Sequence, residues 1–393
     1  MHRADPHPLS EGTRQQAAIP FVLMRGGTSK AVFLRGRDLP ADHRQRDAVI
    51  LSLFGSPDRR QVDGLGGADL LTSKLAIIDP PSRGDADLDY TFAQVSVTEP
   101  VVDYDINCGN ISAAVGAFAI DECLVAIQGP VTTVRIHNTN TGRLLIADVP
   151  VDDGSAAVEG DCEVHGVPGT GAPIALDFGG TSGGSTGSLL PTGHTTDILD
   201  TEFGPVEATI MDLGNLTVFF AAAGVGMTGA EGPDAFDAAV LGAIGAVKEA
   251  AAKLLGMPAD GLTPVPALVG PPMDYTVFGT GDKVTAESVD FVARVVGGRP
   301  PVPHKAYPGT LGACTGVAAA MEGTTVHAVA RPSRDGVIRI GHMSGVLSVR
   351  ARVRRDGAGW RVEQASYDRT ARRLAEGTAY VRRAAIDPSD DGA

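Results

Sequence analysis

Residues 102–120 read VDYDINCGNISAAVGAFAI, and this stretch places a cysteine where a helix is expected to begin. Cys108 stands between Asn107 and Gly109, and small and apolar residues at helical spacing follow directly. Unpaired backbone N–H groups and the positive end of the helix dipole stabilise a thiolate at such a position. The stretch therefore predicts a reactive cysteine. The alternative is a buried structural cysteine in an Ala-rich helix.

A second stretch repeats this pattern later in the chain. Residues 308–321 read PGTLGACTGVAAAM, in which a cysteine again lies beside glycine near the start of an Ala-rich helix. Residues 210–220 can be laid over residues 23–33, which matches Phe220 with Phe33. Two similar halves are the natural inference.

A run rich in glycine and serine separates the two halves. Residues 179–187 read GGTSGGSTG, a composition typical of a flexible inter-domain connection. We therefore expect a flexible tail over 1–17, a first half over 18–190 and a second half over 191–393, with a C-terminal segment that can pack back on the first half.

Periodicity and turn residues predict the remaining elements. Helices are expected over 41–54 and 233–256, and strands over 70–78, 90–97, 131–136, 143–149 and, around a glycine turn, 337–349.

Lys74 lies inside the apolar strand expected over 70–78. A lysine in such a strand either extends its ammonium group to the sheet edge or is held in a cleft, where burial lowers the pKa of a lysine. The residues alone leave both readings open.

A glycine hairpin near the N-terminus offers groups that bind carboxylates. Arg25, Thr28, Ser29 and Lys30 flank its Gly-Gly turn, and turn N–H groups with hydroxyls and cations form a plausible carboxylate cradle. Most such hairpins bind nothing. A second glycine turn exposes His342, for which a solvated turn residue is the simpler reading.

Composition argues against several classes of partner. The chain has 393 residues, 43% hydrophobic, with a formal net charge of -14, which is unfavourable for binding nucleic acid or an anionic membrane. No run approaches a membrane span, and the N-terminus lacks an apolar signal core. Four widely spaced cysteines fit a reducing compartment, and no Cys/His cluster has zinc-ligand spacing. We expect a cytoplasmic protein without a metal.

Six motifs in order closely resemble the PrpF-type isomerase family, which includes 2-methylaconitate cis-trans isomerase, 4-oxalomesaconate tautomerase and methylitaconate delta-isomerase. They are MRGGTSK (24–30), LTSK (71–74), NCGN (107–110), GSLLPTG (187–193), GHMSG (341–345) and RTARRLAEG (369–377). The resemblance runs from about residue 20 to residue 382. It implies an α+β fold of the diaminopimelate-epimerase type: two similar domains, each a central helix wrapped by mixed strands, with the active site in the cleft between them.

The resemblance also implies roles for individual residues. Lys74 and Cys108 correspond to the catalytic lysine and cysteine of the family. The substrate-binding residues expected from the motifs are Arg25, Thr28, Ser29, Asn107, Gly109, Asn110, Thr310, His342, Ser344 and Gly345. The chain departs from the common pattern at Met343 and Leu216, where the family often has proline, and this leaves the substrate open.

The implied chemistry moves a proton along an unsaturated di- or tricarboxylate without a cofactor. A base and an acid must flank the allylic unit, and a lysine and a thiol that titrate near the working pH suit these roles. The resemblance is compatible with a homodimer and with a functional partnership with an aconitase-like dehydratase. Two rivals stay open: a two-cysteine amino-acid epimerase that uses Cys108 and Cys314, and a non-catalytic accessory partner of such a dehydratase.

Overall fold

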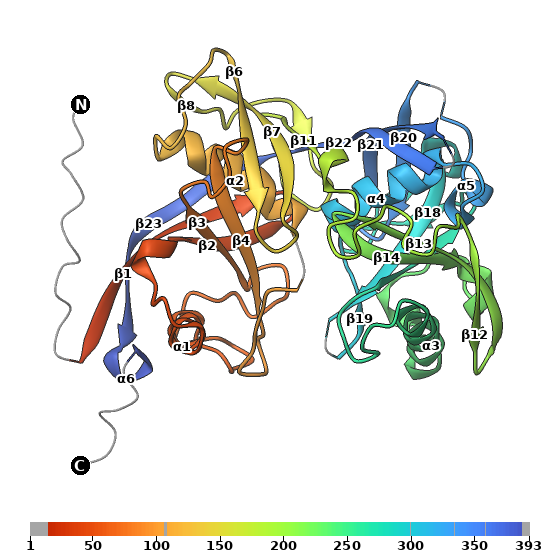
Figure 1. The fold of residues 1–393 in the computed structure, drawn as a ribbon, viewed down its shortest axis with the longest axis horizontal. Coiled ribbons are helices and arrows are strands. Elements are labelled where there is room, and N and C mark those ends of the chain that lie inside the picture. The colour runs from red at the N-terminus through yellow and green to blue at the C-terminus, as the bar shows by residue number, and fades with distance from the viewer. Residues whose placement is uncertain (1–14, 106–107, 299, 334, 358, 387–393) are drawn as a thin grey trace.

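The fold consists of two lobes that lie side by side, each built around one helix enclosed by strands (Figure 1). The computed structural model describes residues 15–105, 108–298, 300–333, 335–357 and 359–386. We call β1–β11 with α1 and α2 the first repeat, and β12–β22 with α3–α5 the second repeat. The predicted α+β class with a central helix in each half is confirmed.

The elements of the first repeat, in chain order, are β1 (Gln16–Gly26), β2 (Ser29–Arg35), η1 (Gly36–Asp38), α1 (His43–Phe54), β3 (Lys74–Asp79), β4 (Leu88–Val95), β5 (Val102–Asp103), α2 (Gly109–Asp121), β6 (Val131–Asn138), β7 (Arg143–Asp152), β8 (Ser155–Ala156), β9 (Cys162–Glu163), β10 (Thr170–Gly171), β11 (Ile174–Asp177) and, after them, η2 (Gly179–Thr181).

The second repeat and the C-terminal segment contain β12 (Asp197–Thr201), β13 (Gly204–Leu213), β14 (Asn215–Ala221), η3 (Ala222–Val225), η4 (Pro233–Ala235), α3 (Ala238–Leu254), β15 (Val265–Gly270), β16 (Tyr275–Thr276), β17 (Lys283–Val284), η5 (Ala286–Ser288), β18 (Phe291–Gly297), β19 (Val302–Pro303), α4 (Gly309–Ala320), α5 (Thr325–Val329), β20 (Val337–His342), β21 (Gly345–Asp356), β22 (Gly359–Arg369), β23 (Ala371–Arg382) and α6 (Arg383–Ile386).

Helix α2 is buried on every side. All its residues from Gly109 to Ile120 are buried, so it has no polar face and must be wrapped by strands. Small residues permit that wrapping, because a Cβ at Gly116 would lie only 2.8 Å from the Val149 side chain on β7. Helix α4 repeats the arrangement, with Gly316 against Val349 of β21.

The two repeats share one order of strand pairing. In the first, β1–β2 is antiparallel, β2–β3 parallel, β3–β4 antiparallel, β4–β6 parallel and β6–β7 antiparallel. In the second, β13–β14, β14–β15, β15–β18, β18–β20 and β20–β21 follow the same alternation. Helices α2 and α4 occupy the same place in this order, before β6 and β20. The inferred repeat is therefore a repeat of topology.

One predicted match between the repeats is wrong by one residue. The β1–β2 hairpin turns through two residues, whereas the β13–β14 hairpin turns through Gly214 alone. Phe33 and Phe219 both belong to the core around α2 and α4, whereas Phe220 faces the separate cluster beneath α3. The counterpart of Phe33 is Phe219, because the shorter turn shifts the strand after it by one position.

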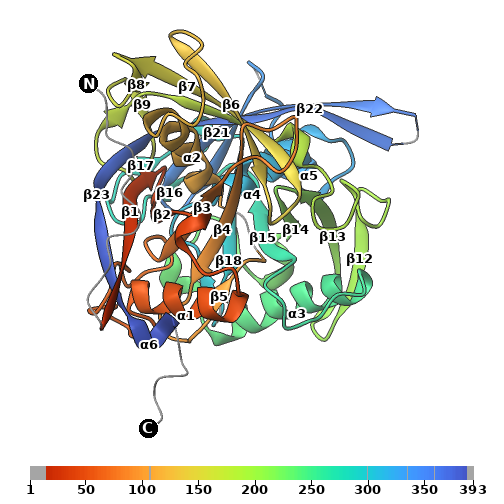
Figure 2. The same cartoon turned by 60° about the vertical axis from the view of Figure 1, so that its left-hand side comes forward.

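Helices α1 and α3 cover the outer faces of the two repeats and lie on the same side of the molecule (Figure 2). Asp42 caps α1 through the N–H groups of Arg44 and Gln45, and Gly55 ends it with φ 72°. Helix α3 begins later than predicted, because Asp237 caps it and the preceding residues form the short η4 turn.

Strand β23 pairs with β1 along its whole length, from Gln16 opposite Arg382 to Gly26 opposite Ala371 (Figure 2). Residues 16 and 17, predicted to belong to a flexible tail, are the first residues of β1, because a partner strand from the far end of the chain extends the ladder to them. Residues 1–14 lie outside the described residues.

The segment expected to be a flexible connection is folded onto one carboxylate. Asp212, 1% exposed, accepts hydrogen bonds from the backbone N–H groups of Ser185 and Thr186 and from the Thr186 hydroxyl. Ser182 also forms a bridge with Leu213. The glycines of this segment therefore allow the chain to turn tightly around Asp212, and they do not form a flexible linker.

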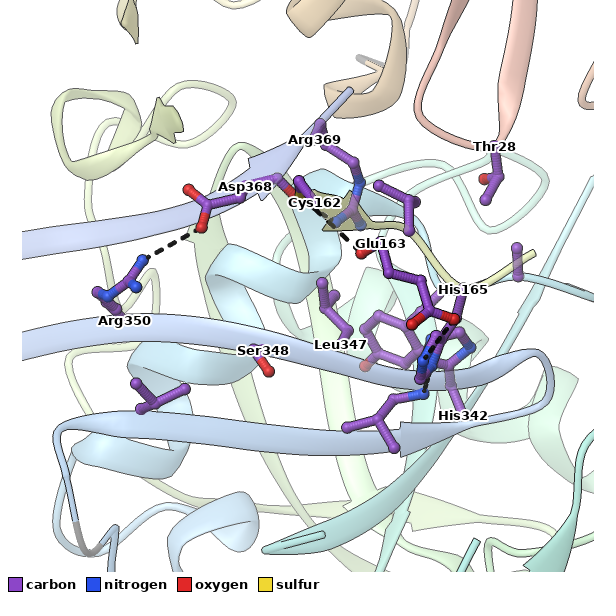
Figure 3. Close-up of a pocket in the computed structure, with 15 residues that line it drawn as sticks. Thr28, Cys162, Glu163, His165, His342, Leu347, Ser348, Arg350, Asp368 and Arg369 are labelled. Atoms are coloured by element: carbon purple, nitrogen blue, oxygen red, sulfur yellow. Dashed lines mark hydrogen bonds and ion pairs between the residues drawn. The ribbon is translucent and has the colours of Figure 1, made fainter. Parts of the chain in front are cut away.

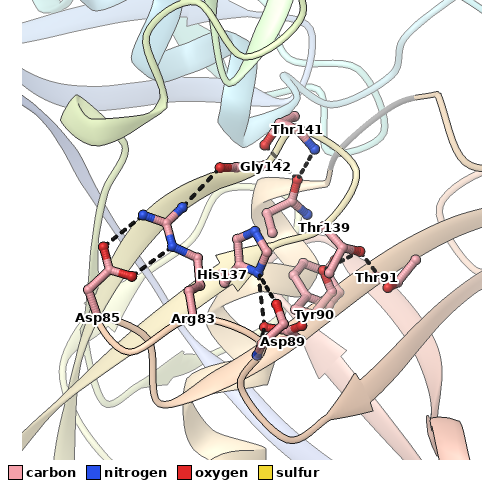
Figure 4. A network of polar contacts seen from close by, with 11 residues as sticks. Arg83, Asp85, Asp89, Tyr90, Thr91, His137, Thr139, Thr141 and Gly142 are labelled. Atoms are coloured by element: carbon pink, nitrogen blue, oxygen red, sulfur yellow. Dashed lines mark hydrogen bonds and ion pairs between the residues drawn. The ribbon is translucent and has the colours of Figure 1, made fainter.

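Polar contacts tie β4 and β6 together where the start of β4 lies beside the end of β6 (Figure 4). Asp89 contacts His137 Nδ1 at 2.9 Å, and Arg83 holds Asp85 and the Gly142 carbonyl. Burial would raise the pKa of Asp89, but hydrogen bonds from Ser82 and His137 hold that pKa below its usual value. These contacts brace the strands that enclose α2.

Among the helices of the described residues, none is long and apolar enough to cross a membrane.

Candidate functional site

A pocket of about 180 Å³ lies between the two repeats. It is lined from both sides by strand ends and by the first residues of the two central helices. The lining residues used below are Ser29, Lys74, Gln94, Cys108, Gly109, Asn110, Asn215, Val265, Gly297, His304, Pro308 and Gly309. We call it the cleft pocket.

Equivalent positions of the two repeats line the cleft pocket, but at the two positions compared here only the first repeat carries an amine and a thiol. Lys74 opens β3 and Val265 opens β15, and both strands run parallel to the hairpin strand beside them. Cys108 is the N-cap residue of α2, and Pro308 is the N-cap residue of α4. An amine and a thiol on one wall thus face an alkyl group and a proline ring on the other.

Lys74 is held inside the cleft and does not reach bulk solvent. It is 6% exposed, and its Nζ donates to Gln94 Oε1 at 2.7 Å and lies 5.2 Å from the centre of the Phe92 ring. Gln94 is itself fixed, because its Nε2 donates to the backbone carbonyls of Ser73 and Leu70. Within the described residues, no carboxylate lies within ion-pair distance of Lys74. The amine of Lys74 is therefore positioned by neutral partners and not by a counter-ion.

Cys108 stands in extended conformation directly before α2, half-buried. The first intrahelical bond runs from Ser112 N–H to the Cys108 carbonyl at 3.0 Å, so the N–H groups of Gly109 and Asn110 have no partner within the helix. The thiol consequently lies at the positive end of the helix, as predicted, in a place that stabilises negative charge.

Helix α4 starts at the same pocket and meets α2 end to end. Its first intrahelical bond, from Gly312 N–H to the Pro308 carbonyl, mirrors that of α2. A Cβ at Gly109 would come within 2.8 Å of the Thr310 nitrogen, which shows how closely the two helix starts approach. Two helix N-termini that converge on one cavity form a site for an anion with more than one negative group.

Asn110, in the first turn of α2, is oriented from both of its amide atoms. Its Nδ2 donates to Thr28 Oγ1 at 2.9 Å, and its Oδ1 accepts from Arg369 Nε at 2.9 Å. The second repeat has a similar asparagine–threonine hydrogen bond with the two residue types exchanged: Asn215 on the hairpin donates to Thr310 on the helix at 2.9 Å. Each hairpin is thus fastened to the start of its central helix.

His304 is a site residue that the sequence analysis missed. It is half-buried and lines the cleft pocket, and its Nδ1 contacts the Ala306 carbonyl, so the ring donates there and its Nε2 is an acceptor. Burial, followed by the nearby charge of Lys74, lowers the pKa of His304 to about 4. The ring is therefore neutral at physiological pH. No pattern in the loop sequence signals this role, whereas Gln94, also missed, was visible as a glutamine in an apolar strand.

The described site residues that were predicted lie in three places: at the cleft pocket, at a second pocket, and in hydrogen bonds within the fold. Lys74, Cys108, Ser29, Gly109 and Asn110 line the cleft pocket, with Thr310 bonded directly behind it. Asn107 lies outside the described residues.

The other predicted binding residues do not line the cleft pocket. Thr28 and His342 line a second pocket (Figure 3). Arg25 Nη1 donates to the Gly27 carbonyl and to Thr370, so it ties the end of β1 to the residue between β22 and β23. Ser344 donates to the Lys305 carbonyl, and the Gly345 carbonyl accepts from Tyr275. Hydrogen bonds within the fold occupy these three residues.

Cys314 is a core residue. It lies in the second turn of α4, is 0% exposed, and its Sγ contacts the Met211 carbonyl at 3.9 Å. Burial raises the pKa of the Cys314 thiol, and the residue lines neither pocket. The position opposite Cys108 belongs to Pro308, so the second repeat offers no opposed thiol.

The described residues contain no group of three or more His, Cys, Asp or Glu side chains that could hold a metal ion.

Gly309 tests how tightly the two helix starts are packed. Its added Cβ would overlap the ring of Tyr367, which is fully buried and stacked on Phe178 with ring centres 5.5 Å apart. Gly309→Ala should lower the free energy of unfolding by about 1–3 kcal/mol through overpacking, measured by urea denaturation. Gly297→Ala is the matched control, because that pocket glycine has no atom within 4 Å of an added Cβ. Equal stability of both variants would contradict the packing described here.

Comparison with known proteins places the chain in a family. A family model described as PrpF protein matches residues 16–382. The chain is 50% identical over 382 residues to 3-methylitaconate isomerase of Eubacterium barkeri, covering 94% of this chain and 99% of that protein. It is 38% identical to 2-methyl-aconitate isomerase of Shewanella oneidensis, covering 93% of this chain and 97% of the relative.

Solved structures agree with the sequence comparison. The crystal structure of a methylitaconate-delta-isomerase superposes with a TM-score of 0.81 at 48% identity, covering 96% of this chain and 99% of the other. A hydroxyproline epimerase from Agrobacterium vitis shares the fold alone, with a TM-score of 0.56 at 12% identity, over 93% and 92% of the two chains. The predicted family and fold class are confirmed. The chain belongs to the PrpF family.

Proposed function

We propose that this protein is an isomerase that moves a proton within an unsaturated di- or tricarboxylate, with Lys74 and Cys108 as its acid–base pair. The observation that carries the proposal is the one-sided cleft pocket. Lys74 and Cys108 line it from the first repeat, whereas their counterparts Val265 and Pro308 cannot exchange protons. Relatives named as 3-methylitaconate and 2-methyl-aconitate isomerases support the substrate class.

The reaction needs one group to remove a proton and one to return it. A base takes the proton from a carbon next to a carboxylate or carbonyl, and the electron pair of that C–H bond spreads over the allylic system as a dienolate. Return of a proton at the far end of the allylic unit shifts the double bond. Rotation within the dienolate before the proton returns gives cis-trans isomerisation. Lys74, held by neutral partners, and Cys108, at a helix start, suit these two roles.

The dienolate and the carboxylates need hydrogen-bond donors. The first N–H groups of α2 and α4, which have no acceptor within their own helices, lie at the cleft pocket, and Ser29 adds a hydroxyl. Donors fixed in the backbone need no rearrangement as negative charge develops, which favours the dienolate over the substrate. Glu99 and Asp103 also line the pocket. We place the substrate carboxylates away from them, toward the helix starts.

Four substrates stay open within this class: 2-methylaconitate, aconitate, 4-oxalomesaconate and methylitaconate. They differ by one substituent, and Met343 and Leu216 are the departures from the family pattern. Met343 packs in the cluster beneath α3, so it does not select the substrate by contact. A homodimer and a partnership with an aconitase-like dehydratase stay predictions of the family resemblance.

The rival functions differ in what they require of the cysteines. A two-base epimerase needs a second base opposite Cys108, and Pro308 stands there while Cys314 is buried in the core. The geometry disfavours this rival. A non-catalytic accessory role predicts ligand binding without turnover, so kinetic measurements separate it from the proposal.

Substitution of the acid–base pair tests the proposed function directly. Lys74→Met and Cys108→Ser should each lower kcat at least about a hundredfold on the four-substrate panel, followed by proton NMR. Cys314→Ala is the control and should keep most of the turnover. Full activity of Cys108→Ser would remove the thiol from the mechanism, and a change confined to KM in Lys74→Met would make it a binding residue.

Gln94 offers a test of Lys74 through the pH profile. Gln94→Glu places a carboxylate where an amide oxygen lies 2.7 Å from Lys74 Nζ, which favours the charged amine and raises the pKa of Lys74 relative to the parent protein. A lysine that acts as a base must be neutral, and one that acts as an acid must be charged. In either case the limb of the kcat/KM profile that reports Lys74 should move to higher pH by about one unit or more. Gln128→Glu, an exposed site, is the charge-matched control. An unmoved or acid-shifted profile in a folded Gln94→Glu protein would contradict the role of Lys74.

A further inference from the structure

A second pocket, of about 220 Å³, lies apart from the lysine and cysteine of the cleft pocket. It forms where residues 162–165 face the β20–β21 hairpin and the end of β22 (Figure 3). Neither Lys74 nor Cys108 lines it, and the proposed function gives it no task.

His342 presents a buried donor to this second pocket. It is 5% exposed, and its Nδ1 accepts the Ser344 backbone N–H at 3.2 Å, so the proton of the neutral ring is on Nε2. Burial, followed by the charges of Arg294 and Arg369, holds the pKa of His342 well below its usual value, so the ring is neutral. Within the described residues, Nε2 has no hydrogen-bond partner. This N–H group is not sealed in the core but opens onto the second pocket, where a ligand oxygen can accept its hydrogen bond.

Arg369 presents a buried cation to the same pocket. It is 6% exposed, its Nε donates to Asn110, and its Nη1 donates to the Asp368 carbonyl at 3.0 Å. No carboxylate of the described chain lies within ion-pair distance of Arg369, and its Nη2 has no partner there. A buried guanidinium without a counter-ion is unfavourable, and a bound anion offsets that cost.

The two acidic residues of the second pocket have other side chains beside them. Asp368 lies 3.5 Å from the cationic Arg350, and Glu163, whose side chain is 68% exposed, lies 3.7 Å from His165 Nε2. These carboxylates are at the more exposed side and do not reach Arg369. The uncompensated positive charge is therefore at the buried end.

Apolar side chains form part of the wall between those ends. Val164, Ala306, Val346 and Leu347 line it, and they give a carbon skeleton a surface to pack against that an inorganic anion would not use. We propose that the second pocket binds a small organic carboxylate, with its carboxylate group on Arg369 and His342 and its carbon chain against Val346 and Leu347. This site is independent of the proposed reaction, although Arg369 also holds Asn110 beside the cleft pocket.

The cysteines of the chain provide a separate reporter for each pocket. Cys162 lines the second pocket, Cys108 lines the cleft pocket, and Cys123 is exposed and lines neither. Alkylation of the full-length protein by iodoacetamide, quantified at each cysteine by peptide mass spectrometry, reads both pockets in one sample. Burial, with a contribution from Asp368, raises the pKa of Cys162, so its alkylation is best followed at mildly alkaline pH.

Succinate is the test ligand and uncharged succinamide its control. Succinate at about twice its Kd should slow alkylation of Cys162 about threefold and leave Cys123 unchanged, whereas succinamide should have no effect. His342→Phe, which keeps a ring but removes the Nε2 donor, should abolish this protection. His304→Phe, which changes a half-buried histidine of the cleft pocket, should keep this protection.

Several outcomes would overturn the second site. The first is an alkylation rate of Cys162 that does not change with succinate, and the second is equal protection of Cys162 by succinamide. The third is protection of Cys162 by succinate that is lost in His304→Phe but kept in His342→Phe. The first two arms use the unaltered protein, so they decide the question even where a variant fails to fold. Turnover by Lys74 and Cys108 is measured separately, and loss of either proposal leaves the other standing.

Discussion

Two helices without a polar face impose the arrangement of this molecule. Helices α2 and α4 are buried along nearly their whole length, so each must be enclosed by strands, and their ends are the only places where backbone groups can reach a ligand. Gly116 and Gly316 allow the enclosing strands to come close. The starts of the two helices meet at one pocket, and the first N–H groups of each have no acceptor within their own helix. Packing of the cores thus brings two helix N-termini together, an arrangement that suits an anion.

The repeat supplies a symmetric frame, and the side chains make it asymmetric. Pairing of β2 with β3 and of β14 with β15 brings Lys74 and Val265 to matching places, and the helix starts do the same for Cys108 and Pro308. A fold of this kind can hold one base on each wall or both groups on one wall. In this chain both groups lie on one wall, which fits proton transfer along a substrate better than inversion of one carbon.

Much of this was predictable from the sequence because the signals were local. The small-residue run after Cys108 predicts a helix that starts at this cysteine, and the apolar neighbours of Lys74 predict a strand, although they leave open whether its lysine lies in a cleft or at the sheet edge. What failed depended on distant contacts. Phe220 was matched instead of Phe219 because one residue is missing from a turn, and residues 16 and 17 gained a strand partner from beyond residue 380. No sequence motif surrounds His304, and only the fold brings this residue close to Lys74. The motif around His342 is a site feature, but nothing in its spacing reveals that it faces a different pocket.

The central claim, that proton transfer runs along an unsaturated polycarboxylate from one wall of the cleft, is tested most directly by isomerisation in deuterium oxide followed by proton NMR. The account predicts that unsaturated di- or tricarboxylates gain solvent deuterium at the allylic carbons between which the double bond moves. Amino acids, including proline, should show no exchange at the α-carbon. Exchange at the α-carbon of an amino acid, with none in the polycarboxylates, would contradict the account.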